Sequence, residues 1–250
     1  MKVVRPNPNN KDLGAILDGR MRKVGPEKIQ KPKTQMNANL REMARSSFGY
    51  GGWDAKYWFI GPEQGIGAED LLTRVRAWTE LGGRDLNDCR EFHCRINETR
   101  WHCKKPKVDL QSTWRRLMLL MMAFLGRPVD RESLRNYQRD QWGRSGGETC
   151  VIELSGLAAP NLEEAEDTSL FLQTRIEVIR GKIADHKPRL VIMYGDMQRD
   201  SWEAIVSPLC FRDDKVLVSG STIFAHTPHP NKRGLLDSYW TDLGRRLRGL

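Results

Sequence analysis

Long hydrophobic runs are missing from this sequence of 250 residues. No stretch approaches the roughly 18 apolar residues that a membrane-spanning helix needs. The apolar segment 117–125 has the length of a buried helix instead. The first residues also lack the apolar core of a secretory signal peptide. We therefore expect a cytoplasmic protein with no membrane partner.

Cysteine is scarce, with five residues, and the odd number is typical of a reducing compartment. Three cysteines and two histidines nevertheless lie close together in the sequence: Cys89, His93, Cys94, His102 and Cys103. A structural zinc site usually combines two tight pairs of ligands. Here four residues separate the first two cysteines and eight separate the last two, which fits that pattern poorly. We therefore expect no metal and no cofactor, and we interpret residues 84–110 as a basic, irregular insertion.

Two signatures of nucleotide chemistry are also absent. The glycine-rich stretch 61–67 is not followed by Gly-Lys-Ser/Thr, so it is not a Walker phosphate-binding loop. No Pro-Cys-x-x-Cys motif is present, which excludes the zinc-dependent deaminases of nucleobases. The middle of the chain contains no linker rich in glycine and serine or in proline. We therefore expect a single domain over residues 46–250.

Positive charge is what the sequence has in excess. The formal net charge is +9, and the isoelectric point is about 9.5. Residues 1–45 hold 11 Lys/Arg against 4 Asp/Glu, and residues 229–250 hold 5 against 2. Such an excess favours binding to phosphate backbones, because it releases their counterions. We interpret residues 1–45, which contain several prolines, as a basic and partly extended arm.

Short apolar runs alternate with segments of helical periodicity along the rest of the chain. Helical spacing is clear at Leu71, Leu72, Val75 and Trp78. The expected strands cover residues 57–60, 150–155, 188–194, 215–219 and 222–225, and the expected helices cover 69–80, 111–126, 170–184, 198–205 and 235–250. This alternation predicts a three-layer α/β/α fold, with a mostly parallel central sheet covered on both faces.

Three loops that follow expected strands carry the residues of most interest. The first reads Gly61-Pro-Glu-Gln-Gly65, the second runs from Ser155 to Asn161, and the third reads His229-Pro-Asn-Lys-Arg233. In order and spacing, residues 55–250 resemble the uracil-DNA glycosylase superfamily. The resemblance implies a uracil-DNA glycosylase-like fold with DNA as the partner. It also implies a monofunctional DNA glycosylase, which flips a base out of DNA and hydrolyses its N-glycosidic bond.

The resemblance assigns roles to single positions. In that family, the third residue of the first loop positions or activates the attacking water, and a histidine of the last loop stabilises the leaving base. Glu63 and His229 hold these positions here, so the resemblance makes them catalytic. Gln64 replaces the family's proline. Ser155 replaces an asparagine that reads the uracil edge, and Glu153 lies two residues earlier on the same strand face.

The residue types themselves suit this chemistry. A carboxylate such as Glu63 can direct a water molecule at C1′ of the sugar. Its negative charge can also stabilise the oxocarbenium-like sugar of the transition state. A histidine beside basic residues, such as His229, can stabilise the departing base. The expected substrate-binding residues are Tyr50, Trp53, Gly61, Gln64, Glu153, Ser155 and Asn161, and Tyr57 is a further aromatic candidate for holding the base. The expected wedge and DNA contacts are Asn231, Lys232 and Arg233, with His226 in support.

Simpler interpretations of these residues stay open. Glu63 in a glycine-rich turn could cap the following helix, and Glu153 in an apolar strand could belong to a structural ion pair. Ser155 could merely end its strand. His226 is more typical of a packing residue than of a catalyst.

The departures from the family pattern point away from uracil. A carboxylate at Glu153 can accept a hydrogen bond from a cytosine amino group, whereas an asparagine suits uracil. We therefore expect a non-standard pyrimidine as the substrate. Some bacterial relatives in the resembled family remove heavily modified cytosines of phage DNA, such as glucosylated hydroxymethylcytosine, so the resemblance also implies a role in anti-phage defence or DNA repair. Uracil excision, DNA binding without catalysis, and hydrolysis of a small molecule are the alternatives. We expect a monomer.

Overall fold

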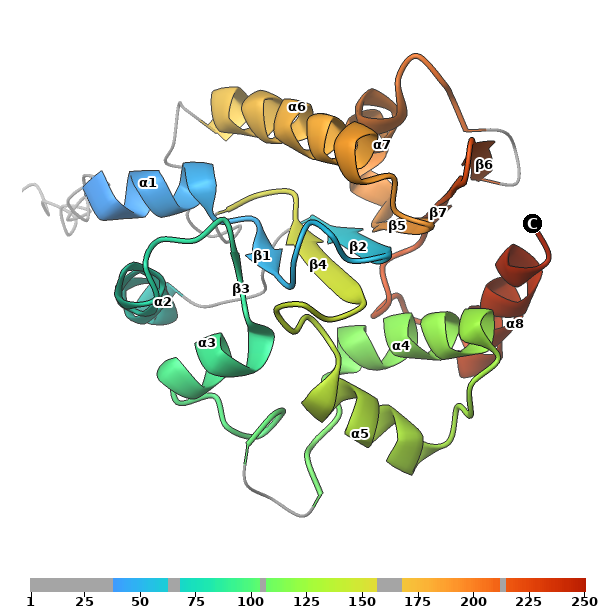
Figure 1. Cartoon of the computed structure of the whole chain (residues 1–250), viewed down its shortest axis with the longest axis horizontal. Coiled ribbons are helices and arrows are strands. Elements are labelled where there is room, and N and C mark those ends of the chain that lie inside the picture. Colours follow the sequence, from blue (N-terminus) through green and yellow to red (C-terminus); the bar gives the residue numbers. More distant parts are fainter. Residues whose placement is uncertain (1–37, 63–67, 104–106, 157–167, 212–214) are drawn as a thin grey trace, which may run out of the picture. The chain divides into compact units, whose positions relative to one another are not determined.

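The chain folds around a mixed sheet of seven strands, with helices on both sides (Figure 1). The computed structural model describes residues 38–62, 68–103, 107–156, 168–211 and 215–250. Across the sheet the strands follow the order β3-β1-β4-β2-β5-β7-β6. They are β1 (Gly49–Tyr50), β2 (Tyr57–Gly61), β3 (Leu86–Asn87), β4 (Thr149–Glu153), β5 (Leu190–Tyr194), β6 (Val216–Ser219) and β7 (Thr222–Thr227).

The helices of the described residues alternate with these strands along the chain. They are α1 (Ala38–Ser46), α2 (Ala68–Glu80), α3 (Cys89–Arg95), α4 (Ser112–Leu125), α5 (Arg131–Asp140), α6 (Thr168–His186), the short 3-10 helix η2 (Asp196–Gln198), α7 (Arg199–Val206) and α8 (Asp237–Arg248). Among these residues, no helix combines the length and the hydropathy that crossing a membrane would require.

Four parallel strands form the centre of the sheet, in the order β4-β2-β5-β7. β6 is antiparallel to β7, and β1 is antiparallel to β4. In the central register, Ile60 lies between Ile152 and Met193. β2, β4 and β5 are buried along their whole length. Their continuous apolar runs match this environment, because a central parallel strand is covered on both faces.

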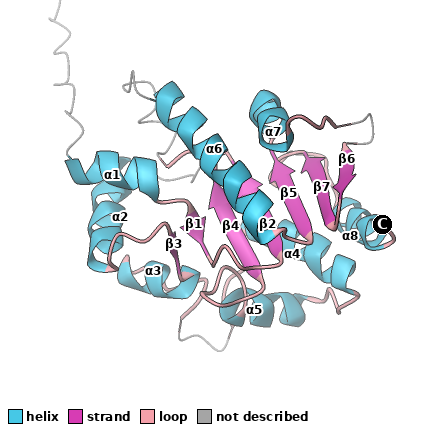
Figure 2. Ribbon diagram, turned by 45° about the horizontal axis from the view of Figure 1, so that its top comes forward, coloured by secondary structure: helices cyan, strands magenta, loops and turns pink. Residues whose placement is uncertain are grey.

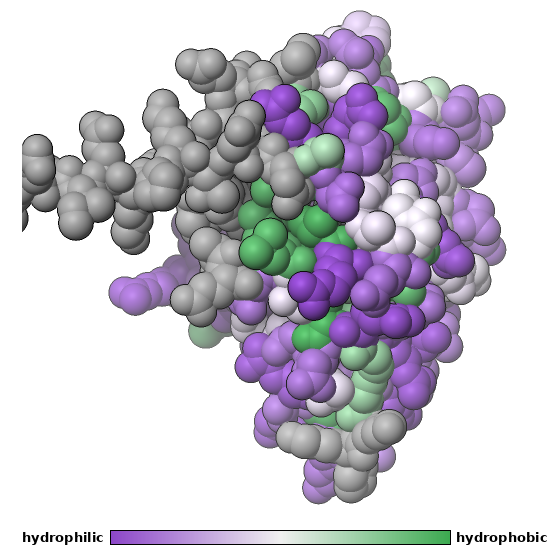
Figure 3. All heavy atoms as spheres, turned by 90° about the vertical axis from the view of Figure 1, so that its left-hand side faces the viewer, coloured by the Kyte–Doolittle hydropathy of each residue, from purple (hydrophilic) through white to green (hydrophobic). Residues whose placement is uncertain are grey.

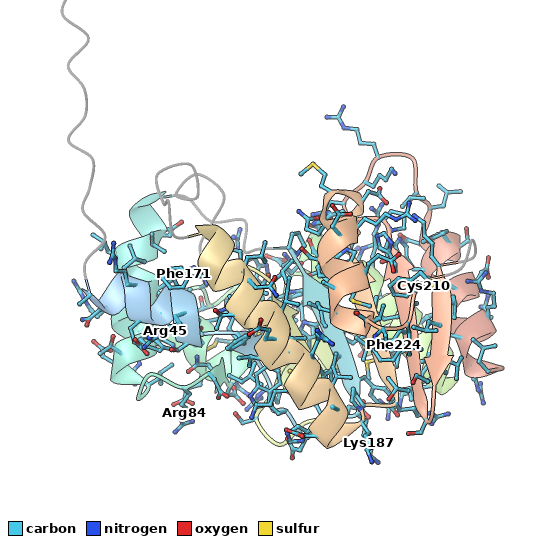
Figure 4. The ribbon with its side chains drawn as sticks, turned by 90° about the horizontal axis from the view of Figure 1, so that it is seen from above. Arg45, Arg84, Phe171, Lys187, Cys210 and Phe224 are labelled. Atoms are coloured by element: carbon cyan, nitrogen blue, oxygen red, sulfur yellow. A yellow bond between two sulfur atoms is a disulfide. The ribbon has the colours of Figure 1, made fainter. Side chains whose placement is uncertain are left out.

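Side chains alternate between two hydrophobic cores, one on each face of the sheet. Phe59 belongs to the core that contains the apolar residues of α4 and α8, whereas Trp58 belongs to the core on the side of α6 and α7. The two helix groups lie on opposite sides of the strands (Figure 2), and the α6–α7 side is in front in Figure 4. Residue 244 of α8 is a glycine, because a Cβ there would lie 2.2 Å from the carbonyl oxygen of Leu120 in α4.

The α/β class expected from the sequence is confirmed, and strands and helices lie close to the expected ranges within residues 46–250. The segment 84–110 is more regular than expected, since it contains β3 and α3. α1 buries Met43 and Ala44 and packs against α2 and α6. The last residues of the expected basic arm therefore belong to the folded domain. Residues 1–37 lie outside the described part of the chain.

The expected apolar stripe of α2 is wrong at one position. Leu72 is 62% exposed, whereas Arg74 is only 7% exposed and lies on the buried face with Leu71, Val75 and Trp78. These four positions follow the i, i+3, i+4, i+7 spacing of one helix face. A charged residue therefore occupies a place on the buried side of α2. On the side of α1, α2 and α3, hydrophilic residues cover most of the described surface around a small hydrophobic group (Figure 3).

The strand order creates a crevice between β2 and β5. The next central strand after β2 is β4, on one side of β2, whereas the next after β5 is β7, on the opposite side. In open parallel sheets, such a reversal leaves a crevice outside the carboxyl ends of the two neighbouring strands, where ligands bind. The topology alone therefore selects the ends of β2 and β5 as the place to look for a site.

A buried arginine of α6 holds the end of β4 in place. Arg175 is 1% exposed, and its guanidinium donates to the carbonyl oxygens of Leu154 at 2.8 Å, Glu153 at 2.6 Å and Ala44 at 3.1 Å. It also lies 4.1 Å from the ring centre of Phe48. Burial lowers the pKa of Arg175 to about 10, which leaves it charged at neutral pH. One side chain thus joins α6, α1 and the carboxyl end of β4.

Replacing Arg175 by methionine should strip three buried carbonyl oxygens of their donor. We expect Arg175→Met to lower the free energy of unfolding by at least about 3 kcal/mol, because buried acceptors left without a partner are costly. Arg180→Met, on an exposed position of the same helix, should cost less than about 1 kcal/mol. Urea denaturation followed by circular dichroism measures both, and equal effects of the two changes would contradict the anchoring role.

Candidate functional site

A cavity of about 630 Å³ opens at the carboxyl ends of the parallel strands. Residues from β4, the ends of β2 and β5, and the loop after β7 line it together with residues of α2, α3 and the start of α4. The lining residues used below are Tyr50, Arg74, His93, Arg100, Trp101, Thr113, Trp114, Glu153, Tyr194, Asp196, Met197, His229 and Asn231. The cavity therefore lies where the strand order places the crevice.

One side of the cavity carries opposite charges next to a phenol. Glu153 at the end of β4 is 8% exposed, and Arg74 of α2 donates from Nη1 to the hydroxyl of Tyr50 at 3.3 Å. Burial raises the pKa of Tyr50 to about 12; the charge of Glu153 adds to this increase, and Arg74 opposes it. Tyr50 is therefore a neutral hydroxyl at physiological pH. The group can both donate and accept hydrogen bonds.

Gly61 at the end of β2 lets the phenol of Tyr194, which lines the cavity, pack directly against its backbone. A Cβ at Gly61 would lie 2.1 Å from the hydroxyl oxygen of Tyr194, which occupies that space. Tyr194 is 4% exposed, and burial raises its pKa well above the ordinary value, with the charge of Glu153 adding to the increase. The ring of Tyr194 in turn meets the imidazole of His229 edge to face, with 5.7 Å between the ring centres.

The loop after β7 presents His229 in a defined tautomer. The backbone N–H of Asn231 donates to Nδ1 of His229 at 3.1 Å, so in the neutral ring the proton is assigned to Nε2. Burial lowers the pKa of His229, which is half-buried, and this favours the neutral ring. His229 therefore offers one N–H donor.

The helix α4 fixes the position of this loop. Asn231 donates from its side-chain amide to Thr113 Oγ1 at 2.9 Å. Arg116 donates to the carbonyl oxygens of Pro230 and Leu235, the latter at 3.1 Å. Two residues in the first turns of α4 thus hold both ends of the loop. Such contacts pre-organise the histidine beside the cavity.

The basic residues after His229 differ in their surroundings. Lys232 makes an ion pair with Asp196 at 2.8 Å, and Lys215 lies 3.7 Å from the same carboxylate. The hydrogen bond from Lys232 is the main reason why the pKa of Asp196 is lowered. Arg233 is exposed. Because exposed ion pairs contribute little, Lys232 can exchange Asp196 for another anion at small cost.

An aromatic wall closes the cavity on the side of α3. Trp101 and Trp114 have ring centres 5.4 Å apart, and His93 touches both of them. Arg100 lies over the ring of Trp101, 4.5 Å from its centre. Flat apolar surfaces of this kind suit a planar ligand ring.

Behind this wall the fold brings a cysteine and two histidines together. Cys89, His93 and His102 are all buried, and one ligand atom from each lies within 4.8 Å of the others. Burial lowers the pKa of His93 to about 3 and that of His102 to about 4. The two remaining cysteines of this segment, Cys94 and Cys103, are joined by a disulfide. The spacing of the cysteines in the sequence did not indicate this combination, because one cysteine and two histidines meet only in the folded chain.

Several expected site residues lie elsewhere. Trp53 donates to Asp85 at 2.6 Å and packs against Trp58 on the α6 side of the sheet. Tyr57 is at the opposite, amino-terminal end of β2 and is buried. The prediction that Trp53 and Tyr57 hold the base is therefore wrong. Trp53 precedes β2 and Tyr57 begins it, whereas the cavity lies at the opposite end of that strand.

Two further residues expected in the site, Ser155 and His226, also lie outside the lining of the main cavity. Ser155 donates its backbone N–H to the carbonyl oxygen of Pro62 at 2.8 Å and so extends the pairing of β4 with β2. His226 is 7% exposed and lies 3.1 Å, through Nε2, from the carbonyl oxygen of Gly195. It lines a separate cavity of about 370 Å³ between β7 and α8. Neither residue lines the main cavity among the described residues.

Three expected site residues lie outside the described residues: Glu63, Gln64 and Asn161. Pro62, which immediately precedes the first two, lines the cavity. The proposed water-activating carboxylate therefore stays a prediction.

Most of the polar and aromatic residues that line the cavity were not predicted from the sequence. Arg74 could have been found from its place on the apolar face of α2. Tyr194 ends a buried strand, which is a usual place for a site residue. Trp101 and Trp114 give no comparable signal, because the fold of residues 84–110 brings Trp101 to the cavity and Trp114 lies on the apolar helix α4. Met197, 92% exposed at the rim, gives none either.

Comparisons with known proteins find no match for this chain among protein-family models, curated proteins or solved structures.

Adding a methyl group at Gly61 should disturb the base of the cavity. We expect Gly61→Ala to lower the free energy of unfolding by about 1–3 kcal/mol, because the new Cβ overlaps the phenol of Tyr194. Gly181→Ala is the matched control: it lies in α6 with nothing within 4 Å of its Cβ, and it should stabilise the helix by about 0.5–1 kcal/mol. Thermal unfolding of both variants distinguishes crowding from a general effect of alanine, and a stable Gly61→Ala protein would disprove the close approach.

Proposed function

We propose that this chain is a monofunctional DNA glycosylase that removes a non-standard pyrimidine and leaves an abasic site. The observation that carries the proposal is the position of His229. A neutral imidazole, fixed by Asn231 with its Nε2–H as donor, lies beside a cavity that Glu153 and Arg74 also line. A leaving base develops negative charge, and a fixed N–H donor at that point stabilises it.

The cavity suits a flipped base in size and lining. Its volume of about 630 Å³ lies within the range of roughly 300–1,000 Å³ found for small-molecule sites. Tyr194, Trp101 and Trp114 supply aromatic surface, against which a flipped base can stack. Glu153 can accept from an exocyclic amino group, and Arg74 can donate to a ring nitrogen or carbonyl oxygen. This pairing of acceptor and donor matches the edge of a cytosine.

The proposed reaction needs one water and two protein groups. The bond between C1′ of the sugar and the base nitrogen breaks, and its electron pair leaves with the base. His229 donates a hydrogen bond to the departing base anion, which later takes a proton from solvent. A water oxygen adds to C1′, and the proton that it loses goes to the carboxylate of Glu63, the expected base in the loop that follows Pro62.

The rim of the cavity suits DNA. Met197 is 92% exposed there, and apolar side chains of this kind can enter a duplex at a base step. Lys232 and Arg233 follow on the His229 loop and can bind phosphates on either side of a flipped nucleotide. The basic residues 1–37, with nine Lys/Arg and three Asp/Glu, would bind further phosphates.

The substrate follows from the same groups. Glu153 in place of an amide favours a base that donates a hydrogen bond, and the cavity has room for a substituent on the ring. A modified cytosine, such as the glucosylated hydroxymethylcytosine of phage DNA, fits both features, and its removal would serve anti-phage defence. Uracil excision in DNA repair is the second candidate, since His229 would serve either base. A DNA-binding protein without catalysis is the third.

Glycosylase activity can be tested on duplexes that carry uracil, hydroxymethylcytosine or glucosylated hydroxymethylcytosine at one position. We expect abasic sites on a modified cytosine, with His229→Ala lowering the single-turnover rate about 10²–10³-fold. Glu63→Ala should lower it as well, whereas His186→Ala, an exposed histidine at the end of α6, should leave it unchanged.

Three results would contradict parts of this account. Tight DNA binding without abasic sites on any duplex would favour the non-catalytic alternative. Excision of uracil in preference to modified cytosine would overturn the assigned substrate. Equal rates for His229→Ala and the unaltered protein would remove the histidine from the chemistry.

The contribution of the basic arm can be measured through salt dependence. We expect a chain that lacks residues 1–37 to bind duplex DNA more weakly and with a shallower dependence of log K on log salt. The slope should fall by about 0.9 for each phosphate that the arm neutralises in the full chain. The cut at residue 37 preserves α1, which packs against α2 and α6. Fluorescence anisotropy at several salt concentrations gives both slopes, and identical slopes would show that the arm binds no phosphates.

A further inference from the structure

The buried cluster of Cys89, His93 and His102 is not used by the proposed reaction. All three side chains are nearly inaccessible, with 0%, 2% and 0% of their surface exposed. Cys89 and His93 are four residues apart on α3, so they share one face of that helix. His102 approaches from the segment that follows. Three groups that can bind a metal thus converge in the buried wall of the cavity.

The two sulfur–nitrogen distances within the cluster match a metal site. The Sγ atom of Cys89 lies 3.5 Å from His93 Nδ1 and 3.4 Å from His102 Nε2. Zinc–sulfur bonds of about 2.3 Å and zinc–nitrogen bonds of about 2.0–2.1 Å, at tetrahedral angles, place sulfur and nitrogen ligands about 3.6 Å apart. Both distances therefore agree with the edge of such a tetrahedron to within about 0.2 Å.

Without metal, the same contacts form a hydrogen-bonded cluster. The Cys89 thiol donates to His102 Nε2, and His93 Nδ1 donates to the carbonyl oxygen of Cys89, 2.6 Å away. A cation between the three side chains would accept a lone pair from each of them. His93 would then give up its hydrogen bond to this carbonyl oxygen, because the nitrogen that binds the metal carries no proton.

We propose that Cys89 Sγ, His93 Nδ1 and His102 Nε2 bind a borderline-soft divalent cation, Zn²⁺, in the wall of the cavity. One thiolate with two imidazoles is a ligand set that zinc accepts, since it binds both kinds of donor. Binding releases the thiol proton to solvent and moves the proton of His93 from Nδ1 to Nε2. The protein supplies three ligands, which leaves the fourth position to water or another donor.

Neighbouring groups hold the first ligand in place. Asp88 caps α3 by accepting from the backbone N–H of Glu91 at 3.0 Å, and Arg144 holds that carboxylate at 2.7 Å. The backbone N–H of Cys89 donates to the carbonyl oxygen of Gly143 at 2.9 Å. Cys89 therefore starts its helix from a fixed position, as a metal ligand should.

The cation would give the aromatic wall its shape. His93 lines the cavity and touches Trp101 and Trp114, while His102 is one residue beyond Trp101 and also touches Trp114. A metal that links α3 to residue 102 would add to the Cys94–Cys103 disulfide in fixing the segment between them, which carries Arg100 and Trp101. This segment has little regular structure of its own, so metal binding would contribute to its folding. The inference does not depend on the identity of the proposed substrate.

Metal content tests the site directly. The full chain, produced in zinc-supplemented medium and analysed by mass spectrometry for zinc, copper, nickel and iron, should contain about one zinc per chain. Cys89→Ser and His102→Gln should lose most of it. Cys150→Ala, which removes another buried thiol, and the double change Cys94→Ser, Cys103→Ser should retain it.

Cobalt and chelation give readouts that do not need a variant to fold. Co²⁺ added to the zinc-depleted chain should produce the near-ultraviolet absorption of a cobalt–thiolate bond, together with the visible bands of a tetrahedral site. A strong chelator should lower the melting temperature of the unaltered chain, and added Zn²⁺ should restore it.

A chain without bound metal, without a cobalt–thiolate band and with unchanged melting in chelator would overturn the proposal. Stoichiometric copper in place of zinc would overturn the assigned cation. Loss of zinc in the Cys94, Cys103 double variant but not in Cys89→Ser would overturn the assigned ligands.

Discussion

The guanidinium of Arg175 is the constraint on which the cavity depends. Carbonyl groups at the end of β4 and the end of α1 point into the protein, where only a buried donor can satisfy them. Arg175 serves Glu153, Leu154 and Ala44 together. The backbone of Glu153 is fixed in this way, so its carboxylate is held at the cavity. The price is a buried charge, which the carbonyl oxygens and the ring of Phe48 offset.

Two further parts of the chain line the cavity, and they are held in place by different interactions. One wall is the His229 loop, which is held in place by its hydrogen bonds with Thr113 and Arg116 of α4. The other is the aromatic segment near Trp101, which lies next to the Cys89 cluster. We propose that the His229 loop takes part in the reaction, whereas the segment near Trp101 determines the shape of the cavity. A substitution in the His229 loop should therefore alter the reaction rate. A substitution near Trp101 should alter the stability of the fold and the fit of the substrate.

Much of the fold could be predicted from the sequence, because apolar runs and helical spacing report burial directly. The place of the His229 loop after a buried strand could be predicted in the same way, from the apolar run that precedes it. Arg74 was not predicted, although its place on the apolar face of α2 could have indicated it. The meeting of His93 with His102 depends on how the irregular segment between them folds. Trp53 was misplaced because strand direction decides which end of β2 a residue lies near.

The most direct test of the central claim is the structure of the protein bound to a duplex. The duplex would contain one glucosylated hydroxymethylcytidine with a 2′-fluoro group, which slows cleavage of the glycosidic bond. The account predicts that this nucleotide leaves the base stack, with its base between Tyr194 and Trp101, its amino group on Glu153, and His229 Nε2 on the base. A duplex that binds elsewhere, or whose modified base stays stacked, would contradict it.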